Sequence, residues 1–209
     1  MRGTNVNTCT VMAGKLRGLP SLPVPVLGLL FMSLWPAKAA AQTAAPPTEL
    51  DTLYVQHVDF EGMTQEGVIV CNKRISGDLR DIFAELYRRK YPIERIRPIS
   101  EYANDDERSM QANNTSCYCY RPIAGSKKLS KHALGLAVDI NPLYNPCVRR
   151  QKDGTLLIQP STGRPYVDRS KAFKYKITKQ DLCYRLFTQY GFRWGGNWKS
   201  LKDYQHFEK

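Results

Sequence analysis

Two short polar motifs together supply two histidines and two aspartates that could build a metal site. The first spans residues 130–139 with the sequence SKHALGLAVD, and the second spans residues 203–206 with the sequence DYQH. The chain contains three histidines, and two of them fall in these motifs. A catalytic zinc site takes three protein ligands and keeps one position for water. The motifs therefore predict a zinc site with one carboxylate left over as a general base.

The spacing suggests a role for each of these side chains. We expect His132, Asp139 and His206 to be the zinc ligands, and Asp203 to be the base that reaches the zinc-bound water. A carboxylate in an apolar segment is costly without a cation, which favours a metal beside Asp139, although a Lys or Arg partner would also serve. The remaining histidine, His57, lies in a strand-like segment and is interpreted as a packed side chain.

The residues between the first two ligands predict how these ligands meet. Gly135 permits a sharp turn after His132. The apolar segment 136–140 is short and bounded by turn residues, which is typical of a buried strand. In such a strand Asp139 points to the same side as Ala137, whose small side chain leaves room for a metal.

Other apolar patterns predict the elements that must position the motifs. Alternation over residues 53–60 and the apolar run 67–71 indicate two strands around a turn at residues 61–62. Asp78 is expected to cap a helix with one apolar face, which ends before Pro92.

The second half of the chain predicts fewer regular elements. Residues 101–116 indicate either a short helix or an active-site loop, and residues 142–176 a long excursion rich in Pro, Gly, Lys and Arg. A helix is expected after Thr178 as its cap, with Asp181 at the capping-box position and Gly191 at its end. Strands mixed with a few helices predict an α+β class.

The N-terminus has the three-part layout of a secretory signal peptide. A basic region precedes an apolar run over residues 24–35, and small residues follow up to Ala41. We expect a signal peptide over 1–41, a linker over 42–52 and one domain over 53–209, with an uncleaved N-terminal anchor as the alternative. The apolar run is shorter than the about 20 residues of a membrane span, so no stable span is expected after cleavage.

The formal net charge of +12 suits an anionic partner. The segment 42–209 holds 27 basic and 19 acidic residues, so the excess remains after the signal peptide is removed. Peptidoglycan stem peptides and teichoic acids are anionic, and a solvated surface is the alternative interpretation. The basic residues form no run of five or more, and we expect no binding to nucleic acid.

Five of the six cysteines lie beyond the predicted signal peptide. Export permits disulfides, and we favour a bond between Cys147 and Cys183 among the possible pairings. Cys117 and Cys119 are too close in sequence to pair comfortably with each other. A metal site at these two residues is the alternative, although a C-x-C pair without a second cluster is a weak zinc signal.

The two motifs resemble those of the M15 zinc peptidases of bacterial cell walls. The pattern S-x-H-x-x-G-x-A-x-D at residues 130–139 is followed by D-x-x-H at residues 203–206. Three further segments are similar to the L-alanyl-D-glutamate peptidase branch, namely 106–121, 139–146 (DINPLYNP) and 192–198 (FRWGGNW). The resemblance covers roughly residues 55–208.

The resemblance implies the same three zinc ligands and the same base, with Asp203 at a position where several branches carry Glu. Family members also have an arginine that polarises the substrate carbonyl. Arg121 is the candidate here, and Arg97 is the alternative. Ser130 either orients a neighbouring group or caps a turn.

Two tryptophans close to the second motif also have two interpretations. Trp194 and Trp198 either line the cleft or fill the core beside the last strand.

The resemblance further implies a mixed fold of the Hedgehog/D-Ala-D-Ala peptidase type, with a central antiparallel sheet and a few flanking helices. The predicted function is a zinc-dependent peptidase that hydrolyses peptidoglycan stem peptides, first as an L-Ala-D-Glu endopeptidase. A D-Ala-D-Ala carboxypeptidase and a non-catalytic zinc-containing cell-wall binding module are the alternatives. We expect Zn2+ as the cofactor, peptidoglycan peptides as partners, a monomer, and a periplasmic or secreted location.

Overall fold

The computed structural model of the chain describes residues 49–123 and 128–209. These residues all belong to the unit Ala44–Lys209, and the predicted signal peptide over 1–41 lies outside them, as does most of the predicted linker. The first strand already begins at Leu50, ahead of the domain boundary expected at 53. Within the described ranges, no helix combines the length and apolar character needed to cross a membrane.

The described part begins with the predicted hairpin. Strand β1 (Leu50–Val58) pairs antiparallel with β2 (Thr64–Asn72) through a turn in which Gly62 has a φ of 81°. Helix α1 (Lys73–Arg88) follows at once, because the side chain of Asn72 caps it by accepting from the Arg74 N–H. Asp78 therefore lies inside the helix, and the predicted cap at Asp78 is wrong.

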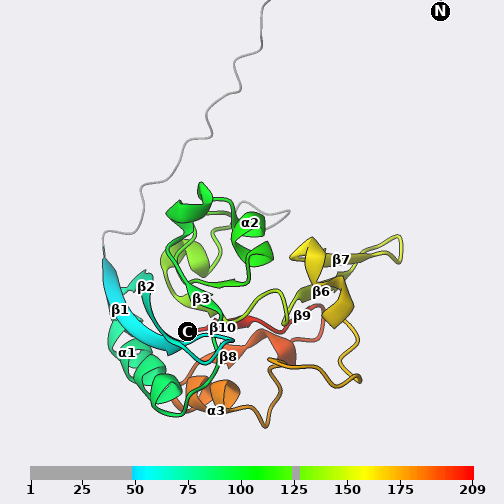
Figure 1. Cartoon of the computed structure of the whole chain (residues 1–209). Helices are drawn as coiled ribbons and strands as arrows, with labels where there is room; N and C mark the ends of the chain where they lie inside the picture. The colour runs from blue at the N-terminus through cyan, green and yellow to red at the C-terminus, as the bar shows by residue number, and fades with distance from the viewer. Residues whose placement is uncertain (1–48, 124–127) are drawn as a thin grey trace, which may run out of the picture. The chain divides into compact units, whose positions relative to one another are not determined.

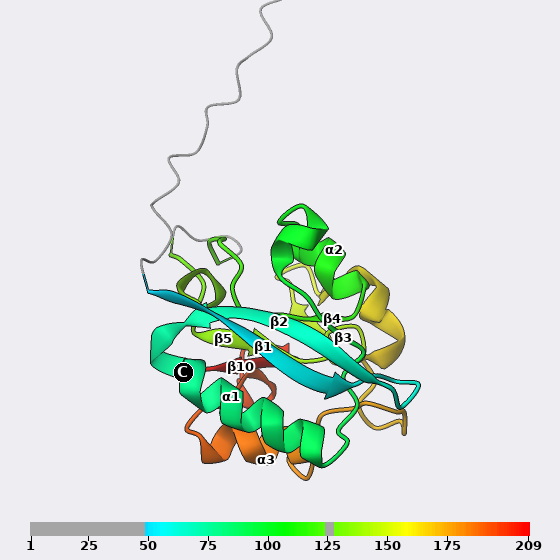
Figure 2. The same ribbon diagram turned by 60° about the vertical axis from the view of Figure 1, so that its left-hand side comes forward.

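The core lies between this hairpin, α1 and the C-terminal elements. The buried face of α1 includes Leu79 and Phe83, and the Phe83 ring packs edge-on against Phe187 of α3 (Leu182–Gln189). Phe187 in turn stacks on Phe207 of strand β10 (His206–Glu208). Each fully buried ring of this kind contributes about 2 kcal/mol. Figure 2 shows α1 and α3 side by side below the β1–β2 hairpin.

Two sheets of three strands make up the centre and one side of the domain. The first has the order β5–β10–β8, with β5 at Ala137–Asp139 and β8 at Arg193–Trp194. The second has the order β7–β6–β9, with β6 at Cys147–Arg150, β7 at Leu156–Gln159 and β9 at Lys202–Asp203. All neighbouring strands in both sheets are antiparallel. Figure 1 shows β10 and β9 near the middle and the β6–β7 hairpin at the right.

Short elements complete the domain. Strands β3 (Arg95–Ile96) and β4 (Asn114–Thr115) form a parallel pair, and four 3-10 turns lie at 99–102, 132–134, 161–166 and 195–197 in the described residues. Helix α2 (Asp106–Gln111) has Asp105 as its N-cap. Of the two predictions for segment 101–116, the short helix is therefore the one that is present.

Helix α3 shows a second difference in capping. Its N-cap is Asp181, whose side chain accepts from the Cys183 N–H, so the predicted cap at Thr178 is wrong. Gly191, with a φ of 82°, follows the C-terminal end as expected. The α+β class is confirmed, whereas a Hedgehog-like central sheet stays a prediction.

Candidate metal centre

The fold brings the three predicted ligands together. His132 lies in the 3-10 turn η2 (His132–Leu134), Asp139 ends β5, and His206 begins β10 directly opposite Asp139 in the antiparallel pair. One ligand atom from each residue lies within 4.8 Å of the others. Their exposed fractions are only 3%, 5% and 6%, respectively. In the described ranges these three residues form the only such group of His, Cys, Asp and Glu side chains.

Two ring nitrogens and the two oxygens of one carboxylate converge at the centre of this group. The His132 Nε2 lies 3.0 Å from the His206 Nδ1, and the same two nitrogens lie 3.2 and 3.1 Å from the two carboxylate oxygens of Asp139. Each of the three residues therefore points its donor atom at a common position.

The outer nitrogen of each ring lies against an acceptor. The His132 Nδ1 lies 2.7 Å from the main-chain carbonyl of Cys117, and the His206 Nε2 lies 3.3 Å from the Glu208 carboxylate. A carbonyl and a carboxylate only accept, so both outer nitrogens carry the proton. The two inner nitrogens face each other and the Asp139 carboxylate, and with a metal ion at the centre their lone pairs would bind it. Such a group fits a cation, and outer partners of this kind commonly orient metal-binding histidines.

The electrostatics of the group favour a positive charge at its centre. Burial alone would lower the pKa of His206, but hydrogen bonds to Asp139 and Glu208 outweigh it and raise this pKa to about 10. Burial alone would raise the pKa of Asp139, but the two histidines outweigh it and hold this pKa far below the ordinary value. The hydrogen bond from His206 also lowers the pKa of Glu208, which stays a carboxylate. Either a proton or a metal ion would supply this charge.

Two glycines allow the close approach of the surrounding chain. Gly135 ends the turn η2 with a φ of 66°, and a Cβ there would lie 2.7 Å from the Asn72 main-chain nitrogen. A Cβ on Gly195 would lie 2.7 Å from the Asp203 carbonyl oxygen and 3.3 Å from the His206 Cβ. The sharp turn predicted at Gly135 is therefore present, and Gly195 lets the segments of Asp203 and His206 pack together.

Asp203 lies beside the group of three predicted ligands but belongs to the other sheet. It ends β9 directly opposite Cys147 of β6, and the Cys147 thiol hydrogen-bonds to its carboxyl group. Its Oδ1 is buried and has no hydrogen-bond partner in the part of the chain that the structure describes. Burial, opposed by the nearby histidines, raises the pKa of Asp203 to about 6. Such a carboxyl group is suited to exchange protons near neutral pH.

A cleft of about 460 Å³ opens onto both groups. The Ser130 Oγ borders it but accepts a hydrogen bond from the Ala133 N–H, as expected for the turn-capping alternative. The lining combines the polar groups with an apolar rim, and it includes the three predicted ligands with Asp203, Arg121, Arg149, Trp198, Met110, Leu129 and Leu201.

The two candidate arginines lie in different places. Arg121 lines this cleft, and its Nε lies 2.7 Å from the Asp106 Oδ2 of α2. Arg97 instead lines a separate polar cavity with His57. Of these two candidates, Arg121 is therefore the one within the cleft. His57 is buried with its Nδ1 2.8 Å from the Ile93 carbonyl, which agrees with a packed side chain.

The two tryptophans lie in different environments. Trp198 lines the cleft, and its ring centroid lies 5.2 Å from that of His206. Trp194 is buried, donates its indole N–H to the Tyr204 carbonyl and stacks against Phe207 in the core. One tryptophan thus borders the cleft and the other fills the core.

The cysteines in the described residues are all free thiols. Cys183 is buried among core residues, beside Tyr91 and Asp181, whereas Cys147 faces Asp203, so the predicted pairing of Cys147 with Cys183 is wrong. Cys117 and Cys119 contact the segment of the predicted ligand His132 through the main chain. The Cys117 carbonyl accepts from His132, and the Cys119 N–H donates to the His132 carbonyl.

Two residues of the site were missed as functional candidates. Glu208 stands two positions after His206, and residues i and i+2 of a strand share one face. That spacing could have indicated its role as a partner of His206. Asp106 meets Arg121 only through the tertiary fold, and the sequence alone offered no comparable signal.

The chain matches a protein family described as D-alanyl-D-alanine carboxypeptidase over residues 124–209. The match includes both sequence motifs and therefore all three predicted ligands and Asp203. Among curated proteins, no match was found. Among solved structures, there was none either.

Proposed function

Because the match over residues 124–209 supports an M15 family peptidase, we propose that the chain is a zinc-dependent hydrolase of peptidoglycan stem peptides. One observation carries the proposal: two imidazole nitrogens and a carboxylate converge within hydrogen-bonding distance of one another in a buried position. Two histidines and one carboxylate form a ligand set typical of catalytic zinc, which keeps a further position for water.

His132, Asp139 and His206 would hold the zinc ion. When bound, zinc supplies Lewis acidity and lowers the pKa of a bound water toward about 7. Asp203 accepts the proton of the attacking water on its carboxylate and passes it to the leaving amine. Its position on β9, next to but outside the ligand group, suits this transfer.

The cleft supplies the remaining functions. Arg121 donates N–H groups to the substrate carbonyl oxygen as negative charge develops there. Asp106 holds Arg121 through their ion pair and is a positioning residue in this scheme. Trp198 lies beside His206 in the cleft lining and would restrict the access of solvent there.

Two peptide bonds are candidates for the cleavage. The motifs around residues 139–146 and 192–198 favour an L-Ala-D-Glu endopeptidase, whereas the description of the matching family favours a D-Ala-D-Ala carboxypeptidase as the second candidate. A non-catalytic binding module is disfavoured because such a protein has no need of Asp203, whose buried Oδ1 has no partner in the described ranges.

The wider assignment follows from this function. We propose that residues 1–41 are a signal peptide, that 42–52 is a linker whose last residues enter β1, and that the peptidase domain occupies the rest. The protein would then act as a monomer in the periplasm or outside the cell, on anionic peptides rather than nucleic acid.

Digestion of purified sacculi by the zinc-loaded protein tests the proposal. Mass spectrometry of the soluble products identifies the bond that is cleaved. New N-terminal D-Glu indicates the endopeptidase, and free D-Ala indicates the carboxypeptidase. Removal of zinc with a chelator should abolish release, and added zinc should restore it. Failure of the zinc-loaded protein to release either product would contradict the proposed activity.

A further inference from the structure

Three basic side chains line the cleft, and they differ in their partners. Arg121 is paired with Asp106, and the Lys131 ammonium donates to the main-chain carbonyl of Lys209. Arg149 is half-buried at the cleft, and its guanidinium has no hydrogen bond or ion pair with any residue in the described ranges. A guanidinium held at the wall of a cleft without an anionic partner is a candidate binding group for an anionic ligand.

The strand places Arg149 close to the proposed base. Cys147 and Arg149 are two residues apart on β6 and therefore share one face, and both line the cleft. Cys147 lies directly opposite Asp203. Two residues of a strand span about 7 Å, which the long arginine side chain can bridge. The guanidinium can thus reach a substrate group about one residue away from Asp203, the proposed proton donor to the leaving amine.

The two candidate substrates share one feature at this position. In D-Ala-D-Ala the residue that leaves with the amine ends in a free α-carboxylate. In the L-Ala-D-Glu case the leaving residue is D-Glu, which continues through its γ-carboxyl and therefore also keeps a free α-carboxylate. Because Asp203 must lie against the leaving amine, the α-carboxylate of that residue comes to the same wall as Arg149.

We propose that Arg149 binds the α-carboxylate of the substrate residue that supplies the leaving amine. This inference rests on the proposed function and identifies the substrate as a peptide with a free carboxylate next to the scissile bond. The guanidinium fork matches a carboxylate with two parallel hydrogen bonds, which a lysine cannot reproduce. Amidation of that carboxylate removes the charge and one acceptor, and it should weaken binding.

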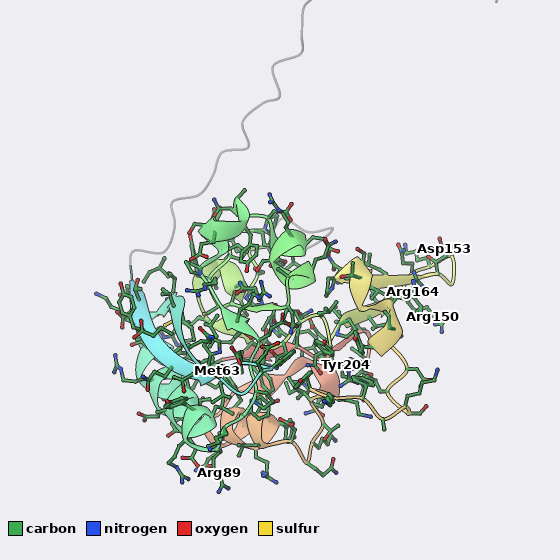
Figure 3. All side chains as sticks on the ribbon, in the orientation of Figure 1. Met63, Arg89, Arg150, Asp153, Arg164 and Tyr204 are labelled. Carbon is green, nitrogen blue, oxygen red and sulfur yellow. The ribbon has the colours of Figure 1, made fainter. Side chains whose placement is uncertain are left out.

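The neighbouring residue offers a matched control. Arg150 follows on the same strand, is exposed and faces away from the cleft lining, and its guanidinium donates to the Gly154 carbonyl within the hairpin. Figure 3 shows Arg150 beside the β6–β7 hairpin, with Asp153 at its turn. Arg150→Gln removes the same charge from the same strand without changing the cleft.

The test compares two peptides that differ only in this group, L-Ala-D-Glu-γ-L-Lys and its D-Glu α-carboxamide. Their binding to the zinc-loaded protein is measured by calorimetry with the Asp203→Asn variant, so that no hydrolysis intervenes. We expect the carboxylate peptide to bind about 10- to 100-fold more tightly than the carboxamide. Arg149→Gln in the same background should reduce this ratio to near one, Arg149→Lys should keep part of it, and Arg150→Gln should leave it unchanged.

Two results would overturn the proposal. One is equal affinity for the two peptides in the parent protein, and the other is a preference for the carboxylate that survives Arg149→Gln. Because binding is read without turnover, this outcome is separate from that of the proposed function. A protein that prefers the carboxylate through Arg149 yet hydrolyses no stem peptide contradicts only the enzymatic assignment.

Discussion

The two sheets that meet at the cleft differ in burial and in the groups they contribute. In β5–β10–β8, the ligand strands β5 and β10 are almost entirely buried, and they carry Asp139 and His206. In β7–β6–β9, most residues are half-buried, and the strands carry Cys147, Arg149 and Asp203. Gly195 lets the chain segments at the junction of the two sheets approach closely.

In the proposed function, this difference would separate metal binding from catalysis. Buried ligands are held by backbone and core contacts and have few alternatives to a cation at their centre. Groups that must meet water and substrate instead lie on a wall that borders the cleft. Changes in the first sheet should therefore alter metal content, and changes in the second should alter turnover while the metal is kept.

The largest effect is expected from loss of a ligand. His132→Ala removes one of three donors, so zinc content should fall to a minor fraction and hydrolysis should fall by at least about 10³-fold. Zinc is measured by elemental analysis of the folded protein and activity with sacculi. His57→Ala is the matched control, because His57 lies in another cavity and should keep full zinc occupancy. Full occupancy in His132→Ala would remove this residue from the ligand set.

A change at the proposed base should distinguish the roles of the two sheets, because activity should fall while zinc content is kept. Asp203→Asn keeps the size of the side chain but cannot accept the proton, so activity should fall by about 10²- to 10⁴-fold. Zinc content should remain at the level of the parent protein. A loss of zinc would instead place Asp203 among the ligands and would contradict the division between the sheets.

A smaller effect is expected at the partner of His206. Glu208→Gln keeps an acceptor but removes the negative charge that orients the ring and favours its protonated Nε2. We expect zinc affinity to fall by about 10- to 100-fold, as measured by competition with a chelator. Activity at saturating zinc should change little. An unchanged affinity would mean that Asp139 and the backbone orient His206 without help from Glu208.

Local patterns predicted much of the candidate site. The turn at Gly135 and the strand that ends at Asp139 follow from residues adjacent in sequence, and both are present. His206 could be added because a third ligand was chemically required. The sequence did not identify the N-cap of α1, because Asn72 and Asp78 both have side chains that cap helices well. Which of the two caps the helix depends on where β2 ends.

The remaining features depend on the tertiary fold. Asp106 and Arg121 are far enough apart in sequence that only the position of α2 joins them. The free thiols of Cys147 and Cys183 likewise reflect two separate environments, one at the cleft and one in the core. Spacing alone cannot distinguish such pairs, because the loops between them carry no periodic signal.

The smallest effect is expected from a change of the Cys147 thiol, which lies next to the proposed base Asp203. The Cys147 S–H stabilises the charged form of Asp203 and so lowers the pKa of a carboxyl group that burial has raised. Cys147→Ala removes this donor, and the pKa of Asp203 should rise. Because the base acts only when deprotonated, a raised pKa moves the acidic limb of kcat/KM to higher pH. Activity on that limb should fall by about two- to fivefold, with little change on the plateau.

Cys147→Ser is the control for this change, because a hydroxyl can donate the same hydrogen bond. We expect the acidic limb of kcat/KM for Cys147→Ser to lie at the same pH as in the parent protein or at a lower pH. Zinc content should be the same in the parent, Ala and Ser proteins. Coincident profiles for the Ala and parent proteins would show that Cys147 does not stabilise the Asp203 carboxylate during turnover. If Cys147→Ala changes both the pH profile and the zinc content, the two sheets are coupled. A substitution beside the base would then also weaken metal binding by the ligands on the buried strands.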